Sequence, residues 1–374
     1  GACSRSRHGS ARPVLVRKSS AALSATYVVG VALAVIGPMV LPANYYFDTA
    51  TIRDHMETAV TVAYNDSFNN TALLYRGLGF GTLFPHALAG PVSFTAVYLA
   101  AVSAAGIARV NWIPWLFALF AAWTVPLAIY DGTYSKEVIA LLVTAAMARL
   151  SGSGRGVAFA AALGLAYAML FRTYWGLVIV LWLTMLMVWR MGGGWALRLF
   201  AAIAVIVPLS LAAHEFAGLW LSDGRTVVVE ARGFAPDPAT MFVNPLQNTS
   251  PVTDIVNTAS GWLMLVLPIS LLLLGGLQHV AFGVFQLTNT ALFVATQRRA
   301  SGAGGTDLPK QWRFAAAATF CVAYSLVQGM FEPDFGSFAK HEINLLPMFF
   351  YMLVHVARNR AEPDICAAHA DARR

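Results

Sequence analysis

The chain has 374 residues, of which 58% are hydrophobic and only 11% charged, and its mean hydropathy is +0.62. This composition excludes an ordinary soluble domain and predicts a polytopic membrane protein. The net charge of +7 comes from basic residues between apolar segments, so it indicates membrane topology and not a nucleic-acid partner. Cys3, Cys321 and Cys366 fall in a tail, a span and a tail, which predicts neither a disulfide framework nor a metal site.

Apolar windows recur along the chain, and a helix needs about 20 mainly apolar residues to cross a bilayer. They predict an all-α fold, a polytopic transmembrane helix bundle of about ten spans (nine to eleven). The predicted spans are 21–43, 85–108, 111–130, 137–150, 156–172, 175–191, 195–214, 260–278, 313–331 and 342–357. Residues 279–297 are also long enough to cross, but we predict an interfacial or re-entrant helix there. An eleventh crossing would carry the C-terminal arginines to the opposite side of the membrane.

Lysine and arginine set the orientation, because cytoplasmic loops retain an excess of these residues. With a cytoplasmic N-terminus, 18 of the 25 basic residues fall on the inner face and 14 of the 18 acidic residues on the outer face. Both termini are therefore predicted to be cytoplasmic. We expect a disordered basic tail over 1–20, one membrane domain over 21–360 with outer loops at about 44–84 and 215–259, and a polar tail over 361–374.

The first outer loop begins with aromatic residues followed by acids. Tyr45 and Tyr46 stand just past a predicted helix end, where aromatic side chains commonly form an interfacial belt. Asp48 and Asp54 follow near the membrane surface. Each is a candidate general base or metal ligand, and the alternative is a solvated loop acid.

A short outer segment from Asp131 to Glu137 leads directly into an apolar helix. Ser135 is placed to cap that helix, and Glu137 to interact favourably with its N-terminal dipole. Lys136 is different, because a cation at a helix N-terminus is locally unfavourable and predicts an anion nearby. A phosphate would bind both Lys136 and the first amide groups of the helix.

Arg172 lies between two apolar spans and is followed by Tyr174 and Trp175. An arginine in this place is either a snorkelling end residue or a functional charge. As a functional charge it would bind a phosphate through two hydrogen bonds. The two aromatic rings beside it would then offer faces to a sugar.

The second long outer loop, 215–259, is more often functional than a plain connection at such a length. Arg232 is its main candidate for binding, and His214, at a helix end, is a second. We expect residues 226–230, a valine-rich stretch, to be extended. Residues 237–258, rich in proline and asparagine, are expected to lie across the active face.

The segment 331–342 holds five titratable side chains between two apolar helices. Charges at the membrane boundary are costly unless they serve binding or catalysis, so this segment is the strongest candidate for a functional site. We expect Lys340 and His341 to meet the substrate. Glu332 or Asp334 would pair with them or bind a metal.

Together these segments resemble bacterial envelope-polysaccharide membrane proteins, in particular the polymerases of O-antigen, capsular polysaccharide and exopolysaccharide repeat units. The likeness covers the order of spans and loops over the whole chain. The motifs that carry it are Tyr46-Phe47-Asp48, Ser135-Lys136-Glu137, Arg172 after a span, and the turn from Glu332 to Pro347. Arg225 and Arg232 are similar to the arginines of the family's large outer loop.

The resemblance implies an enzyme of the bacterial inner membrane, a glycosyltransferase-type polymerase whose substrate is an oligosaccharide on a polyisoprenyl diphosphate. It implies a base that activates an acceptor hydroxyl and cations that stabilise the leaving diphosphate. No nucleotide or other cofactor is required, and the expected partners are the lipid-linked glycan, the lipid bilayer and other polysaccharide-assembly membrane proteins. The implied residues are Asp48, Glu332 and His341 as bases, Lys136, Arg172, Arg232 and Lys340 at the diphosphate, and Tyr174 and Trp175 at the sugar.

Two alternatives stay open. A GT-C-class transferase that uses a lipid-phosphate sugar would place an acid such as Asp48 or Asp54 in the first outer loop and often needs a divalent metal. Its acids are commonly adjacent, and here they are not. A secondary transporter or flippase would carry charges inside its spans and broken helices in two related halves. The predicted spans hold almost no charge, which favours transfer over transport.

Overall fold

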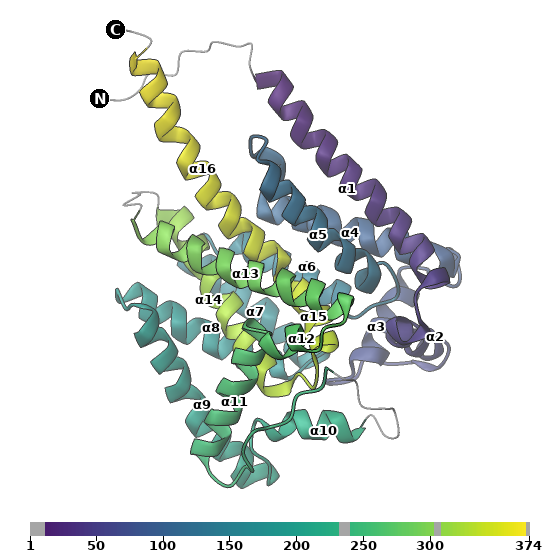
Figure 1. Ribbon diagram of the computed structural model, residues 1–374. Helices are drawn as coiled ribbons and strands as arrows, with labels where there is room; N and C mark the ends of the chain where they lie inside the picture. Colours follow the sequence, from purple (N-terminus) through teal and green to yellow (C-terminus); the bar gives the residue numbers. More distant parts are fainter. Residues whose placement is uncertain (1–11, 232–239, 303–307, 372–374) are drawn as a thin grey trace. The chain divides into compact units, whose positions relative to one another are not determined.

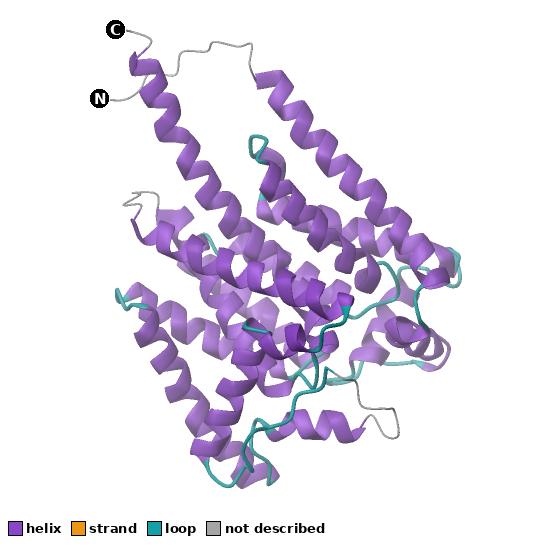
Figure 2. Ribbon diagram, viewed as in Figure 1, coloured by secondary structure: helices purple, strands orange, loops and turns teal. Residues whose placement is uncertain are grey.

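The chain is represented by a computed structural model that describes residues 12–231, 240–302 and 308–371 (Figure 1). The fold is all-helical, with 81% helix and no strand within these ranges, which confirms the predicted class (Figure 2). The helices are α1 Arg12–Val40, η1 Ala43–Tyr46, α2 Phe47–Thr58, α3 Ser67–Gly77, η2 His86–Leu88, α4 Ala89–Ala105, η3 Ile107–Arg109, α5 Pro114–Asp131, α6 Glu137–Leu150, α7 Gly154–Leu170, α8 Tyr174–Arg190, α9 Trp195–Ala217, α10 Asp223–Ala231, α11 Pro251–Val266, α12 Ile269–Leu273, α13 Leu277–Gly302, α14 Leu308–Phe331, α15 Phe335–Glu342, η4 Ile343–Leu345 and α16 Leu346–Asp371.

Within the described ranges, five helical segments are long and apolar enough to cross a membrane. They are Lys18–Val40, His86–Ala105, Pro114–Asp131, Trp195–Ala217 and Gln311–Phe331. Gly154–Leu170 and Tyr174–Arg190 are apolar as well but shorter. The chain therefore carries candidate membrane-spanning helices, as its composition predicted.

The helices fall where the apolar windows predicted them, with two differences. The window 260–278 is split, because α11 ends at Val266 and α12 begins at Ile269, on either side of Pro268. Proline lacks the amide hydrogen that a continuing helix needs, so it separates the two pieces. The window 342–357 begins later than predicted, since α16 starts at Leu346 after α15 and η4.

Three segments predicted to be irregular contain helices. Helix α1 begins at Arg12, inside the predicted disordered tail. The segment 44–84, predicted to be an outer loop, contains α2 and α3, and the side chain of Asp66 caps α3 by accepting from the Asn69 amide at 3.0 Å. The prediction that 226–230 is extended was wrong, because α10 covers it. Tertiary contacts outweigh the weak strand preference of its valines.

The predicted interfacial or re-entrant stretch 279–297 lies within α13, a single continuous helix of 26 residues. It is not among the five long apolar segments. Its described end carries Arg298 and Arg299, both exposed.

The chain divides into two compact units. The first comprises Gly1–Arg149, Arg299–Gly304 and Leu345–Arg374, and the second Leu150–Arg298 and Gly305–Asn344. In the first unit, α1, α4 and α5 lie side by side (Figure 1). Tyr27 of α1 stacks on Phe94 of α4 with ring centroids 6.1 Å apart, and Phe120 of α5 meets Phe350 of α16 edge-on at 5.1 Å. Aromatic contacts of this kind hold the unit's core together.

In the second unit, α8 and α14 form the core. The Trp182 indole N–H donates to the Ala316 carbonyl at 2.9 Å, which satisfies the polar atom of a fully buried ring. Helices α11 and α14 cross closely at Gly261 and Gly329. A Cβ atom at Gly329 would lie 2.7 Å from the backbone nitrogen of Trp262, so only glycine permits this close approach of the two helices.

Candidate functional site

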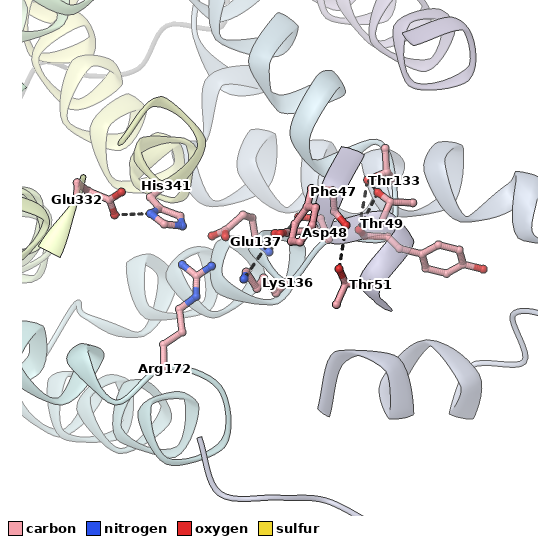
Figure 3. A network of polar contacts seen from close by, with 12 residues as sticks. Phe47, Asp48, Thr49, Thr51, Thr133, Lys136, Glu137, Arg172, Glu332 and His341 are labelled. Atoms are coloured by element: carbon pink, nitrogen blue, oxygen red, sulfur yellow. Dashed lines mark hydrogen bonds and ion pairs between the residues drawn. The ribbon is translucent and has the colours of Figure 1, made fainter. Parts of the chain in front are cut away.

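The first unit holds an ion pair predicted in part from the sequence. The Lys136 ammonium lies 3.6 Å from an Asp48 carboxylate oxygen, and both side chains are mostly buried (Figure 3). The ammonium also sits 3.8 Å from the centre of the Phe68 ring, a cation–π contact. Asp48 occupies the first turn of α2, where a carboxylate suits the helix dipole. Asp48 therefore supplies an anion beside Lys136.

The turn before α6 is built as the sequence predicted. The Ser135 hydroxyl accepts a hydrogen bond from the Glu137 amide at 3.2 Å and so caps α6, and Glu137 stands in the first turn. Thr49 of α2 donates to Thr133 at 2.7 Å, which ties α2 to the same turn (Figure 3). These contacts fix the backbone on both sides of the ion pair.

An aromatic cluster beneath this turn was not predicted. The Tyr134 ring lies edge-on to Tyr75 at 4.8 Å, and its hydroxyl is 2.7 Å from a ring nitrogen of His86. The Tyr75 hydroxyl is 2.9 Å from that of Ser93. Burial raises the pKa of Tyr75 to about 12, so this phenol stays neutral near pH 7. The Tyr75 hydroxyl also contacts the Thr133 and Ser135 carbonyls, so the cluster packs against the turn before α6. No local sequence signal links its members.

The second unit holds the densest polar group. His341 of α15 faces Glu332, which follows the end of α14, and a ring nitrogen of His341 hydrogen-bonds to the Glu332 carboxylate (Figure 3). The prediction that an acid of this segment pairs with the basic residues is confirmed. Glu332 is buried, whereas the His341 side chain keeps 17% of its exposure. The Tyr324 hydroxyl donates to the His341 carbonyl at 3.1 Å and fixes the backbone here.

Asp334 has a structural role in this segment. Its carboxylate accepts from the Ser337 amide at 2.8 Å and caps α15. Backbone bonds also join this turn to the segment before α11, because the Phe242 amide donates to the Pro333 carbonyl at 2.8 Å. Residues next to Phe242 therefore run alongside the Glu332 turn.

Arg172 is buried and does not snorkel into solvent. It is 7% exposed, and a guanidinium nitrogen donates to the Tyr174 hydroxyl at 2.8 Å. The Tyr174 ring stacks on Phe331, with centroids 6.0 Å apart, and Phe331 directly precedes Glu332. A continuous line of contacts thus runs from the Arg172 guanidinium to the acid–imidazole pair.

Trp175 lies in the core of the second unit. It is fully buried, and its ring contacts Tyr167, Phe320 and Tyr324. No face of Trp175 is open to a sugar in this structure, so Tyr174 is the aromatic candidate of the two.

The two remaining candidate cations are Lys340 and Arg232. Lys340 occupies the last turn of α15, next to His341, and is half-buried. Arg232 lies outside the described residues.

A buried polar network in the second unit includes Arg225, which the sequence resemblance singled out, and Asp254, which the sequence analysis missed. Asp254 of α11 is fully buried, accepts a hydrogen bond from the Ser222 amide at 2.8 Å and binds the Ser210 hydroxyl. Arg225 of α10 is also buried and donates to Asn244 at 3.0 Å. A lone acid within an apolar helix is a usable sequence signal for Asp254.

Glu342 lies one residue beyond His341 but is buried, and its carboxyl pairs with Gln286 of α13. Burial raises the pKa of Glu342 to about 8, against which the Gln286 hydrogen bond acts weakly. This carboxyl is therefore mainly protonated near pH 7.

Within the described ranges, no group of three or more His, Cys, Asp or Glu side chains is arranged to hold a metal ion. Comparison of the chain with protein-family profiles, with curated proteins and with solved structures found no match. We therefore infer the function from the geometry of the site.

Proposed function

We propose that the chain is a glycosyl-transfer enzyme of the bacterial inner membrane that acts on polyisoprenyl-diphosphate-linked oligosaccharides and joins them into a polysaccharide. The observation that carries this proposal is the pair of His341 and Glu332 at a helix junction, with the buried Arg172 linked to it through Tyr174 and Phe331. A base and a cation in one cluster are what transfer from a diphosphate requires.

The chemistry assigns one task to each group. The tautomer that donates from Nδ1 to Glu332 carries its basic lone pair on Nε2, and His341 takes the proton of an acceptor hydroxyl there. The hydroxyl oxygen forms a bond to the anomeric carbon of the donor sugar, and the bond from that carbon to the diphosphate oxygen breaks. The diphosphate leaves with the electron pair and its lipid, and Arg172 stabilises its charge, with Lys340 as a second cation.

The proposal includes the membrane arrangement predicted from the sequence. About ten spans would place the segments 44–84 and 215–259 on the outer face, with both termini in the cytoplasm. The five long apolar segments and the two shorter apolar helices support a membrane location. The Asp48–Lys136 pair is retained as a candidate contact for a lipid-linked diphosphate, in which the phosphate would replace the carboxylate as partner of the ammonium.

The first test is genetic. A strain that lacks the chain should accumulate lipid-linked single repeat units, and an unchanged glycan profile would contradict any role in glycan assembly. The accumulated unit then serves as substrate for the full chain purified into lipid nanodiscs. Wild type should yield a ladder of lengthened products on a gel, whereas one added unit only would favour the GT-C alternative, as would loss of activity on chelation of divalent ions.

The same assay tests the assignment of the base. His341→Gln and Glu332→Gln should each lower kcat by about a hundredfold or more, because a positioned base contributes roughly that much. His55→Ala is the matched control, since the His55 ring bonds to the Thr51 carbonyl of its own helix α2 at 2.9 Å and packs against Phe68, both in the first unit. Full activity of the His341 variant in properly inserted protein would remove the mechanism.

A further inference from the structure

Arg225 is a buried cation that forms no ion pair with an acid among the residues that the structure describes. Its side chain is among the largest fully buried ones of the described chain, and its Nε atom has no hydrogen-bond partner there. One terminal nitrogen donates to Asn244 at 3.0 Å and the other to the Gly329 carbonyl, while the guanidinium stands 5.8 Å from the Phe242 ring. Burial lowers the pKa of Arg225 to about 10, so it remains charged near pH 7.

The helix crossing is shaped to admit this guanidinium. At Gly261 of α11, an added Cβ atom would lie 2.0 Å from a terminal nitrogen of Arg225 and 2.3 Å from the Gly329 carbonyl oxygen. The missing side chain at Gly261 therefore creates the slot in which Arg225 reaches α14. A buried charge of this kind is costly unless an opposite charge or dipole compensates it.

The compensation lies at the end of α14. The last carbonyl groups of a helix carry partial negative charge, and Gly329 contributes one of them. Glu332 follows directly, with its amide bonded to the Gln328 carbonyl at 2.8 Å. A carboxylate at a helix C-terminus is unfavourable by itself. Arg225 offsets both charges, since it binds the carbonyl and Glu332 is the acid that acts on it electrostatically.

We propose that Arg225 is a positioning residue for the Glu332–His341 pair: its guanidinium, inserted through the Gly261 slot, holds the C-terminal turn of α14 and brings a positive charge to the turn that Glu332 follows. The inference rests on the proposed function, because it gives Arg225 a role in the same transfer. Arg225 does not touch the substrate in this scheme. It acts through Glu332, which in turn orients His341.

A double-mutant cycle separates this role from a general contribution to folding. In the wild-type background, Arg225→Met should lower kcat by at least about tenfold, the effect of losing hydrogen bonds from a buried charged group, and leave KM nearly unchanged. In the Glu332→Gln background, the same change should lower kcat by less than about twofold. Equal factors in both backgrounds would overturn the proposal.

Arg198→Met is the matched control, because Arg198 of α9 also donates to a backbone carbonyl, that of Gly193 at 3.0 Å, and covers an aromatic ring, that of Trp195. Arg198→Met should lower kcat by the same small factor in the wild-type and Glu332→Gln backgrounds. Arg225→Lys, which keeps the charge, should recover part of the lost kcat. If Arg225→Met does not fold, Asn244→Ala loosens the guanidinium while keeping its charge and should show the same dependence on Glu332.

Hydrogen exchange gives a readout that does not require turnover. Amides of residues 329–335 should lose protection in Arg225→Met and not in Arg198→Met, both measured in nanodiscs. If wild type proves inactive but this difference is found, the proposed function fails while the structural role of Arg225 stands. If wild type is active and the exchange is unchanged, the role of Arg225 fails while the proposed function stands.

Discussion

Glu332 and Glu342 show how two carboxyl groups of one short segment come to differ. Glu332 hydrogen-bonds to the ring of His341 just after α14 ends, whereas Glu342 is buried against the amide of Gln286. The environment of Glu342, and not its residue type, raises its pKa.

The buried Glu342 predicts a pH dependence of stability. The unfolded chain releases this proton near the ordinary pKa of 4.5 and the folded chain near 8, so the free energy of unfolding should fall as the pH rises through that interval. Glu342→Gln removes the cost of a buried carboxylate charge. Above pH 8 its free energy of unfolding should exceed that of wild type by about 1 kcal/mol or more, and below pH 4.5 the two should differ little. Thermal unfolding in nanodiscs at several pH values measures this, with the exposed Glu57→Gln as control; parallel curves for wild type and Glu342→Gln would contradict it.

Pairs close in sequence were predictable and distant ones were not. Glu332 and His341 are nine residues apart around a Pro-containing turn, and the density of titratable groups there predicted that Glu332 or Asp334 would pair with the basic residues or bind a metal. Arg225 and Gly329 are 104 residues apart, and Ser210 and Asp254 are 44 apart. Such contacts depend on which helices cross, and a single sequence does not specify the crossing.

At the scale of elements, the crossing of α11 and α14 depends on two residues without side chains, Gly261 and Gly329. Neither was selected from the sequence, because an isolated glycine in an apolar helix has several explanations. Proline was more informative, since Pro268 separates α11 from α12 within one predicted span. The amphipathic α2 and α3 were missed because their few apolar residues do not form a long window.

The crossing predicts a loss of stability in Gly261→Ala. The added methyl group would overlap the Gly329 carbonyl oxygen and the Arg225 guanidinium, and the overpacking should cost about 1–3 kcal/mol. Gly176→Ala is the matched control, because Gly176 is also helical but has nothing within 4 Å of the added atom. It should be neutral or slightly stabilising. Equal midpoints of thermal unfolding for the two variants would show that the slot is not tightly packed.

At the scale of the whole molecule, composition predicted the helical class and the membrane location, but it did not predict the division into two units. That division follows contacts, since the first unit combines Gly1–Arg149 with Leu345–Arg374 from the far end of the chain. A hydropathy pattern identifies each apolar helix separately, and it does not indicate which helices pack against each other.

The predicted topology has a direct test in single-cysteine variants of a cysteine-free chain. A membrane-impermeant maleimide applied to intact cells should label positions 54 and 336, which lie in predicted outer segments, and should miss positions 109 and 299 until the cells are permeabilised. All four positions are exposed in the structure, so access depends on the side of the membrane. Labelling of 299 without labelling of 336 would invert the orientation and place the proposed chemistry in the cytoplasm.

Buried indole rings also give each unit an optical reporter. Trp123 lies in the core of the first unit, and Trp175 and Trp182 in that of the second. Indole emission shifts to longer wavelength when the ring is exposed to water, so the unfolding of each unit shifts the emission of the rings buried in it. With the other emitters replaced by phenylalanine, denaturation followed at these rings would reveal whether the two halves melt together or in sequence.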